Sequence, residues 1–383
     1  MSMTYRFVNA VDTVSIRGNK LFGDAGSHGE SNFPPKPSVL SGAFRSVLWV
    51  NNGGDANAIQ QSSFSITGVF LACQDQHGKV ELFLPLPADL LVTDKDEKNK
   101  EAGKVVRKLE PQEVDKAIQH SQASQLPMMP ILRQGKPAKP ENGWLLNQSG
   151  MAAYLRGEKL NEIHITKQAE LWSKESRIGI GLNRDSRTAD DGKLFTVEHT
   201  VPKHSENWDD PKHKVANEKM AGLVVGIANG EDLQESGFIR LGGDGRAAEF
   251  SLTGAPAITP IPKTDKFKLV LLTPGLFTNG WLPDGIVEES GAYWLKLDGF
   301  KARLACATVS RAEVVSGWDL ECWKPKDAER TAPSGSVYWF DQAEGDFAAL
   351  DKLVTQGLWA KTPDNELNSR RAEGYNRVLL AAW

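Results

Sequence analysis

Apolar residues between positions 39 and 48 recur at the spacing of one helix face. The spacing predicts an amphipathic helix whose apolar stripe is Val39, Leu40, Ala43, Phe44, Val47 and Leu48. Three prolines just before it, Pro34, Pro35 and Pro37, favour an extended approach to the helix. We expect Ser38 to be the N-cap, because its hydroxyl can accept a hydrogen bond from an unpaired backbone N–H.

The opposite face of this helix is polar and carries Ser41, Gly42, Arg45 and Ser46. A helix N-terminus attracts anions, and Lys36 stands directly before this one. Lys36, the helix N-terminus and Arg45 would together make a phosphate-binding site. The alternative is an ordinary amphipathic helix that packs on a sheet and turns its polar face to solvent.

Short apolar runs predict strands along most of the chain. Expected strands are 5–11, 13–16, 65–72, 79–84, 177–182, 194–199, 221–227, 237–241, 267–272 and 378–382, and a second helix is expected at 347–355. The sequence 75–78 joins two of these strands and predicts a hairpin, in which Gly78 can supply a positive φ. Residues 94–125 are charged and contain little apolar surface, so we expect a surface insertion there.

An uncharged, proline-rich stretch, 254–262, predicts a linker between two domains. The order of elements starts again after it, so we expect an α+β protein of two tandem ferredoxin-like (βαββαβ) domains. The first would span 1–254 and contain insertions at about 90–145 and 200–220, and the second would span 255–383.

Charge and cysteine content narrow the classes of function. The 383 residues carry a formal net charge of −4, so any nucleic acid must meet a local basic surface. No apolar run reaches the ~18 residues of a membrane span, and the first residues lack a signal-peptide core, so we expect a cytoplasmic protein without membrane contact. Cys73, Cys306 and Cys322 are too few and too scattered for a disulfide framework or a zinc site.

The glycine-rich segment from Arg240 to Arg246, RLGGDGR, has three interpretations. It resembles the GGDD hairpin of nucleotide polymerases, but that chemistry needs paired carboxylates for two metal ions, and here Gly245 follows Asp244. A loop flanked by two arginines is better suited to backbone N–H groups that approach phosphates. The third interpretation is a tight turn that needs glycine only for its conformation.

The histidines are weaker candidates. His199, His204 and His213 lack the spacing of a metal site, and we expect neither a metal nor a cofactor. His28 precedes the proline-led helix, where the general base of a metal-independent RNase would be useful. A solvated loop histidine is the simpler interpretation.

Five segments of the chain resemble one protein family. The proline-rich turn and the Ser38-x-x-Ser41-Gly42-x-x-Arg45 helix resemble the RAMP superfamily of CRISPR-associated proteins. Four further segments resemble one branch of it, the third Cmr subunit of type III-B CRISPR effector complexes. They are RIGIGLNRDSRTADDGKLF (177–195), GFIRLGGDGR (237–246), LVLLTPGLFTNGWLP (269–283) and SGWDL…KPK…APSGSVYWF (316–340). Together they span nearly the full chain in the expected order.

The resemblance implies RRM-like, ferredoxin-like domains and a non-catalytic subunit that holds the 5′ tag of the CRISPR RNA. It also implies two protein partners in an antiviral ribonucleoprotein, the large polymerase-like subunit and the backbone RAMP subunit. Recognition of single-stranded RNA on such folds combines phosphate contacts with splayed bases. Two alternatives stay open: an endoribonuclease that processes the CRISPR RNA precursor, and a scaffold that contacts only protein.

The candidate RNA-binding residues are basic, hydroxyl-bearing or glycine residues of the loops and the helix described above and of the loop 17–20. They are Arg17, Lys20, Lys36, Ser38, Ser41, Arg45, Arg177, Arg184, Arg187, Arg240, Gly242, Gly243 and Arg246. We expect no catalytic residue, no metal ligand and no small-molecule cofactor.

Overall fold

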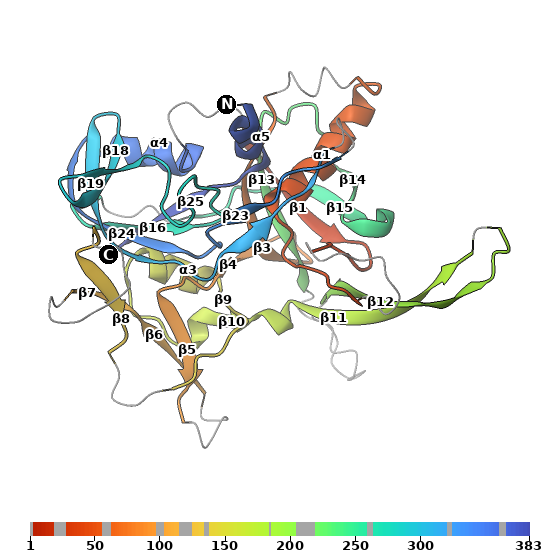
Figure 1. The fold of residues 1–383 in the computed structure, drawn as a ribbon, viewed down its shortest axis with the longest axis horizontal. Coiled ribbons are helices and arrows are strands. Elements are labelled where there is room, and N and C mark those ends of the chain that lie inside the picture. The colour runs from red at the N-terminus through yellow and green to blue at the C-terminus, as the bar shows by residue number, and fades with distance from the viewer. Residues whose placement is uncertain are drawn as a thin grey trace. The chain divides into compact units, whose positions relative to one another are not determined.

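The computed structural model describes residues 3–18, 28–55, 63–96, 103–114, 125–133, 138–183, 185–203, 219–258, 263–319, 324–359 and 365–383. The protein is of mixed α+β class, as predicted, and its main sheets are antiparallel (Figure 1). By their internal contacts the residues form two units. Within the described residues, no helix is both long and apolar enough to cross a membrane.

The first unit comprises Met1–Glu81, Gln168–Ala255 and Val315–Ala328. Its elements are β1 (Met3–Ala10), β2 (His28–Gly29), α1 (Pro37–Asn51), β3 (Ser65–Asp75), η3 (Gln168–Glu170), β11 (Trp172–Leu182), β12 (Ala189–Pro202), β13 (Lys219–Ala228), β14 (Ser236–Arg240), η4 (Gly243–Gly245), β15 (Ala247–Thr253), β21 (Trp318–Asp319) and β22 (Lys324–Pro325). Two strands, β4 (Val80–Pro85) and β20 (Glu313–Val315), carry the chain from one unit to the other.

The main sheet of the first unit has the order β3-β13-β1-β15-β14, and all neighbours are antiparallel. Helix α1 connects β1 to β3, and Leu40, Phe44 and Leu48 of the predicted stripe are buried. The Phe44 ring meets the Phe250 ring of β15 edge to face, with centroids 5.5 Å apart. The apolar spacing therefore predicts both the helix and its buried face correctly, and this packing is the main source of the helix's stability.

The start of α1 differs from the prediction. Pro37 is the first helical residue, and Lys36 is the N-cap with an extended backbone (φ −65°, ψ 149°). Proline suits this position because an N–H in the first turn of a helix has no acceptor within the helix, so the N–H that proline lacks is not missed. The φ of proline is also close to the helical value. Ser38 therefore lies inside the first turn, and the prediction that it caps the helix is wrong.

The second unit comprises Leu82–Lys167, Pro256–Val314 and Glu329–Trp383. Its elements are β5 (Leu90–Asp94), β6 (Lys104–Lys108), β7 (Glu110–Glu113), β8 (Met128–Ile131), β9 (Trp144–Leu146), α3 (Gln148–Leu155), η2 (Glu162–His164), β10 (Ile165–Lys167), β16 (Phe267–Leu271), β17 (Ile286–Glu289), β18 (Ala292–Leu297), β19 (Phe300–Thr308), β23 (Glu329–Thr331), β24 (Val337–Gly345), α4 (Ala348–Gln356), α5 (Asn365–Glu373) and β25 (Val378–Ala382). The predicted helix 347–355 and strand 378–382 correspond to α4 and β25.

The main sheet of the second unit has the order β17-β18-β19-β24-β16-β25 and is also antiparallel. One face forms an apolar core, in which Phe267 stacks on Phe340 with centroids 5.1 Å apart. The next residue of β16, Lys268, points to the other face, because side chains alternate along a strand. There it contacts Asp89 and Tyr154, which come from the segment 82–167 of the same unit.

The two main sheets share one strand order. In the first unit, four strands follow one another along the chain as β1, β3, β13 and β15. Across the sheet they are arranged as β3, β13, β1, β15, that is, the second strand of the chain, then the third, the first and the fourth. In the second unit, β16, β19, β24 and β25 lie in the same order. The helices differ: α1 follows the first of these strands in the first unit, whereas α4 and α5 follow the third in the second unit.

The predicted domains, 1–254 and 255–383, and these units differ in two ways. The units change between Ala255 and Pro256, close to the predicted boundary, but 82–167 groups with the second unit and 315–328 with the first. The predicted surface insertion 94–125 also contains strands, since β6 and β7 lie within it. Contacts between segments a hundred residues apart leave no local pattern in the sequence, so sequence order cannot reveal such a grouping.

Candidate nucleic-acid interface

The segment that follows β1 lies against β12 in the first unit. Val14 and Thr200 exchange two backbone hydrogen bonds of 2.9 and 2.8 Å. The Ser31 hydroxyl lies 3.1 Å from the Thr200 hydroxyl and accepts a hydrogen bond from the backbone N–H of Ile16 at 3.2 Å. Arg17 forms a backbone bridge with Ser31, so this network fixes the backbone from which the Arg17 side chain extends.

The glycine-rich turn between β14 and β15 contacts the same segment. Gly242 has a φ of 84°, and a Cβ on it would lie 2.4 Å from the Ser15 carbonyl oxygen, so only glycine fits. The backbone N–H of Gly243 donates to that carbonyl at 2.6 Å. Because this N–H is engaged inside the protein, the geometry favours the tight-turn interpretation at Gly243, and that backbone N–H groups of the loop approach a phosphate stays a prediction.

The polymerase interpretation also lacks support in this turn. Asp244 is exposed and adopts the left-handed conformation, with a φ of 57°. Across the described residues, no three His, Cys, Asp or Glu side chains form a group that could hold a metal ion. Two residues after Asp244 stands the cation of Arg246, which disfavours a metal ion nearby.

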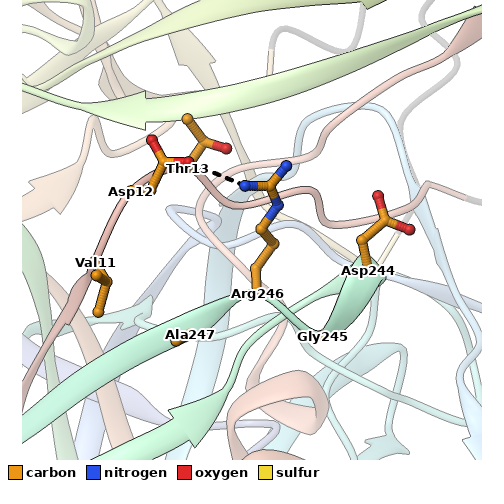
Figure 2. A pocket seen from close by; sticks show the side chains of 7 residues that line it. All are labelled: Val11, Asp12, Thr13, Asp244, Gly245, Arg246 and Ala247. Atoms are coloured by element: carbon orange, nitrogen blue, oxygen red, sulfur yellow. Dashed lines mark hydrogen bonds and ion pairs between the residues drawn. The ribbon is translucent and has the colours of Figure 1, made fainter. Parts of the chain in front are cut away.

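Arg246 forms an ion pair with Asp12 at a hollow in the surface. Figure 2 shows the guanidinium pointing toward the carboxylate, and its Nη1 lies 3.0 Å from Oδ2. The hollow has a volume of about 310 Å³ and is lined by Val11, Asp12, Thr13, Asp244, Gly245, Arg246 and Ala247. The side chains of Arg246 and Asp12 are 28% and 62% exposed. A phosphate oxygen from solvent can therefore reach the guanidinium, and arginine is well suited to bind it.

His199 of β12 is buried beneath these charges. Its Nδ1 lies 3.1 Å from the Thr13 hydroxyl. Burial lowers the pKa of His199, the charges of Arg177 and Arg246 lower it further, and Asp244 and Glu175 oppose them. Since the lowering prevails, His199 is neutral at pH 7, and the positive charge here belongs to the two arginines.

The charges of Arg177 of β11 and of Arg246 therefore both act on His199, and we call these two residues the arginine pair. Arg177 is held by Glu175, with Nε 2.9 Å from Oε1. A third predicted residue, Arg240, is exposed at the end of β14 and lies opposite Ala247 in the register. The structure thus brings Arg177 and Arg246 together around His199, and it places Arg240 at the same hairpin end as Arg246.

The predicted site on α1 has a different geometry. The Arg45 guanidinium lies 3.3 Å from the Ser41 hydroxyl, 3.3 Å from the Phe64 carbonyl oxygen and 5.4 Å from the centroid of the Phe64 ring. Ser41 itself is buried. Lys36 stands nine residues before Arg45, which is about 13 Å along a helix axis, so the helix does not bring the two cations to one phosphate. That α1 binds RNA stays a prediction.

The other predicted residues lie away from the arginine pair or outside the described residues. Arg187 is in the turn between β11 and β12, with a φ of 56°. The end of β11 at Leu182 is already about 16 Å along the strand from Arg177. Ser38 lies in the first turn of α1, and Lys20 and Arg184 are not among the described residues.

Thr13 and His199 are part of this site, but the sequence does not predict their contact. They are 186 residues apart, and the sequence offers His199 only as a doubtful metal ligand. The one available signal for His199 is that it is a polar residue within an apolar strand pattern. Many strands contain such a residue, so the signal does not identify a site. His28, the candidate general base, is exposed in β2 and pairs in register with Thr196.

Two solved structures contain a chain of similar fold. One match is a chain of a cryo-EM structure of the type III-B Cmr-beta bound to cognate target RNA and AMPPnP, with a TM-score of 0.53 and 14% identity over 98% of this chain and 96% of that chain. Another is a chain of the type III-B Cmr-beta bound to cognate target RNA, with a TM-score of 0.52 and 15% identity over the same shares. A search of curated proteins found no match.

The family is established by a direct sequence match. The model of the CRISPR-associated protein family Cas_Cmr3 matches residues 6–383, which is nearly the whole chain. This confirms the resemblance to the third Cmr subunit that the sequence motifs indicate. The chain belongs to the Cas_Cmr3 family of CRISPR-associated proteins.

Proposed function

We propose that this chain is a non-catalytic, RNA-binding subunit of a type III-B CRISPR effector complex and holds the 5′ tag of the CRISPR RNA. Membership of the Cas_Cmr3 family supports the place in the complex. The solved structures of similar fold are chains of Cmr-beta complexes bound to target RNA, which supports an RNA–protein assembly. The large polymerase-like subunit and the backbone RAMP subunit are the partners that we propose, in the cytoplasm.

The arginine pair is the observation that carries the RNA-binding proposal. Arg177 and Arg246 place two positive charges around one buried, neutral histidine in a chain of net charge −4. Each is held by a carboxylate that is itself about half exposed or more, so neither is sealed in the interior. Guanidinium groups in this state bind the phosphates of single-stranded RNA and set the backbone path.

The strand order supports the finer description of the fold. An antiparallel sheet in which the strands lie second, third, first, fourth is the arrangement of a ferredoxin-like βαββαβ unit, and both main sheets have it. We infer that each unit derives from such a domain, with one of its two helices replaced by extra strand: β14, which pairs with the fourth strand β15, in the first unit, and the hairpin of β17 and β18 in the second. The two predicted domains remain our proposal for the organisation of the chain.

Salt-dependent RNA binding tests the proposal. In the full-length chain, Arg177→Ala and Arg246→Ala should each weaken binding of a single-stranded RNA that carries the 5′ tag. Each should also reduce the slope of log K against log salt by about 0.7, as expected for one lost phosphate contact on a single strand. Lys301→Ala is the control, because Lys301 pairs with Glu344 on the surface of the second unit.

The result that would overturn the proposal is an unchanged affinity and salt slope in the double variant Arg177→Ala/Arg246→Ala, with its melting temperature unchanged. An RNA that lacks the tag sequence separates tag recognition from general binding. A scaffold that contacts only protein would give no measurable RNA affinity in the parent chain either. An endoribonuclease would cleave the RNA during the assay.

A further inference from the structure

A buried titratable side chain, His199, lies beneath the hollow at which Arg246 and Asp12 form their ion pair. It is 3% exposed, and its Nδ1 lies 3.1 Å from the hydroxyl of Thr13. Figure 2 shows Thr13 among the residues that line the hollow. Histidine is the side chain whose ordinary pKa, about 6.5, falls in the physiological range. A charge that arrives at the hollow therefore acts on a group that can take up a proton.

The hydrogen bond with Thr13 suits both protonation states of the imidazole. A hydroxyl can donate to the unprotonated Nδ1 of a neutral histidine, and the same oxygen can accept from the Nδ1–H of the protonated ring. The backbone beside both partners is fixed, because Val14 and Thr200, the residues that follow them, exchange two hydrogen bonds. His199 can therefore gain a proton while it keeps its partner.

Charged groups act on His199 from two neighbouring elements. On β11, Glu175 lies opposite His199 in the register, and Arg177 lies diagonally across from it on the same face of the hairpin. Asp244 and Arg246 come from the turn between β14 and β15, and their charges act on His199 as well. The imidazole is thus surrounded by two guanidinium groups and two carboxylates.

These charged groups also act on one another. The hydrogen bond to Glu175 raises the pKa of the Arg177 guanidinium, and the carboxylate of Asp12 raises it further. The hydrogen bond from Arg177 lowers the pKa of the Glu175 carboxyl, and the charge of Arg246 adds to this. Asp12 in turn pairs with Arg246 at 3.0 Å. Arg177 and Arg246 share their charged neighbours, so an anion bound by either one changes the field at His199.

We propose that RNA binding at the arginine pair is coupled to the uptake of one proton by His199. In the free chain, burial and the two guanidinium groups disfavour the protonated imidazole. A phosphate that binds these groups brings a negative charge close to the ring and favours its protonated form. By linkage, RNA strengthens protonation and protonation strengthens RNA binding by the same factor. The coupling rests on the proposed RNA site and assigns to it a dependence on pH.

The pH dependence of RNA affinity tests the coupling. A single-stranded RNA that carries the 5′ tag should bind the full-length chain at least about fivefold more tightly at pH 5.5 than at pH 7.5, at constant salt. His199→Gln has no imidazole to titrate and should lose most of this increase. His77→Gln, in the exposed turn between β3 and β4, is the matched control and should keep it. The same increase in His199→Gln as in the parent chain would contradict the proposal.

NMR titration of histidine gives a second measurement that needs no change at His199. In the RNA-free chain labelled with ¹³C at the histidine Cε1, the His199 signal should titrate at a higher pH in Arg177→Ala/Arg246→Ala than in the parent chain. The reason is that two positive charges are gone. In the parent chain, addition of the tagged RNA should shift the His199 titration in the same direction. A titration that neither change moves would show that no coupling exists.

Failure of the RNA site and failure of the coupling give different results. If the RNA site were wrong, the double variant Arg177→Ala/Arg246→Ala would bind RNA as tightly as the parent chain at every pH, and the coupling would fail with it. If only the coupling were wrong, the double variant would bind more weakly, while the parent chain and His199→Gln would respond equally to pH.

Discussion

Lys268 and Asp89 form an ion pair in which neither side chain is exposed, with Nζ 3.1 Å from Oδ2. The Tyr154 hydroxyl donates to the other carboxylate oxygen of Asp89 at 2.8 Å, and the Lys268 ammonium lies 4.1 Å from the centroid of the Tyr154 ring. Lys268 belongs to β16, whereas its two partners belong to the segment 82–167. Buried charges therefore attach this segment to the sheet of its own unit.

Removal of one member of this pair should lower the free energy of unfolding. Lys268→Met leaves the Asp89 carboxylate buried without its counter-charge, and such a loss costs about 3–5 kcal/mol of unfolding free energy. Urea denaturation followed by far-UV circular dichroism measures the difference. Lys266→Met, at an exposed position two residues earlier, is the control. A loss below about 1 kcal/mol for Lys268→Met would contradict a structural role for the pair.

The same pair predicts how stability depends on pH. Burial lowers the pKa of Lys268 to about 8, below its ordinary value near 10.4. Between these values the unfolded chain holds a proton that the folded chain has released, so stability rises with pH. Burial also raises the pKa of Tyr154, so stability falls again above about pH 10, where the unfolded tyrosine ionises. The parent chain should gain about 2 kcal/mol relative to Lys268→Met between pH 8 and 10; a flat difference would show that Lys268 does not titrate there.

Asp12 should oppose RNA binding, because it occupies the Arg246 guanidinium that we assign to a phosphate. An exposed ion pair contributes at most about 1 kcal/mol, so Asp12→Asn should tighten RNA binding by about two- to fivefold. Fluorescence anisotropy with labelled RNA at low salt gives the affinity. Glu344→Gln releases Lys301 in the second unit and should leave affinity unchanged. Weaker binding by Asp12→Asn would mean that the ion pair positions Arg246 for RNA.

Gly242→Ala should distort the turn that holds Arg246. The new methyl group would meet the Ser15 carbonyl oxygen in a backbone conformation that L-residues rarely adopt, which costs about 1–3 kcal/mol. Thermal unfolding measures the loss, and RNA affinity should fall with it. Gly254→Ala is the control, because a Cβ there meets nothing within 4 Å. Equal melting temperatures for the two variants would contradict the close contact.

The isolated chain should leave RNA uncut. A metal-independent RNase needs a base, an acid and a cation held in position around one phosphate. His28 is exposed in a two-residue strand, and buried His199 has its Nδ1 within hydrogen-bonding distance of Thr13. Labelled precursor RNA incubated with the chain, with and without Mg²⁺ or Mn²⁺, should remain intact. Discrete cleavage that disappears in His28→Ala would establish the nuclease alternative.

Sequence patterns predicted what depends on neighbours in the chain. The stripe from Val39 to Leu48 specified α1 because burial of one helix face leaves a spacing of three and four residues. The N-cap was misassigned because two competing signals, a serine and a proline at the first helical position, stand side by side. The contact between Thr13 and His199 depends on strand pairing across most of the first unit. The grouping of 82–167 with the second unit depends on contacts with segments far later in the chain, among them the buried pair of Asp89 and Lys268, and no local pattern in the sequence reveals such contacts.

The pairing of β1 with β13 sets an order of events during synthesis. Met3 pairs with Ala228, so the first strand has no partner on that side until more than half of the chain has left the ribosome. Pairing between such distant segments is slow, because a long loop must close before any contact stabilises it. Until then β1 and the apolar face of α1 remain exposed to other chains. The yield of folded protein should therefore depend on translation speed and chaperone supply more than on the stability of the finished sheet.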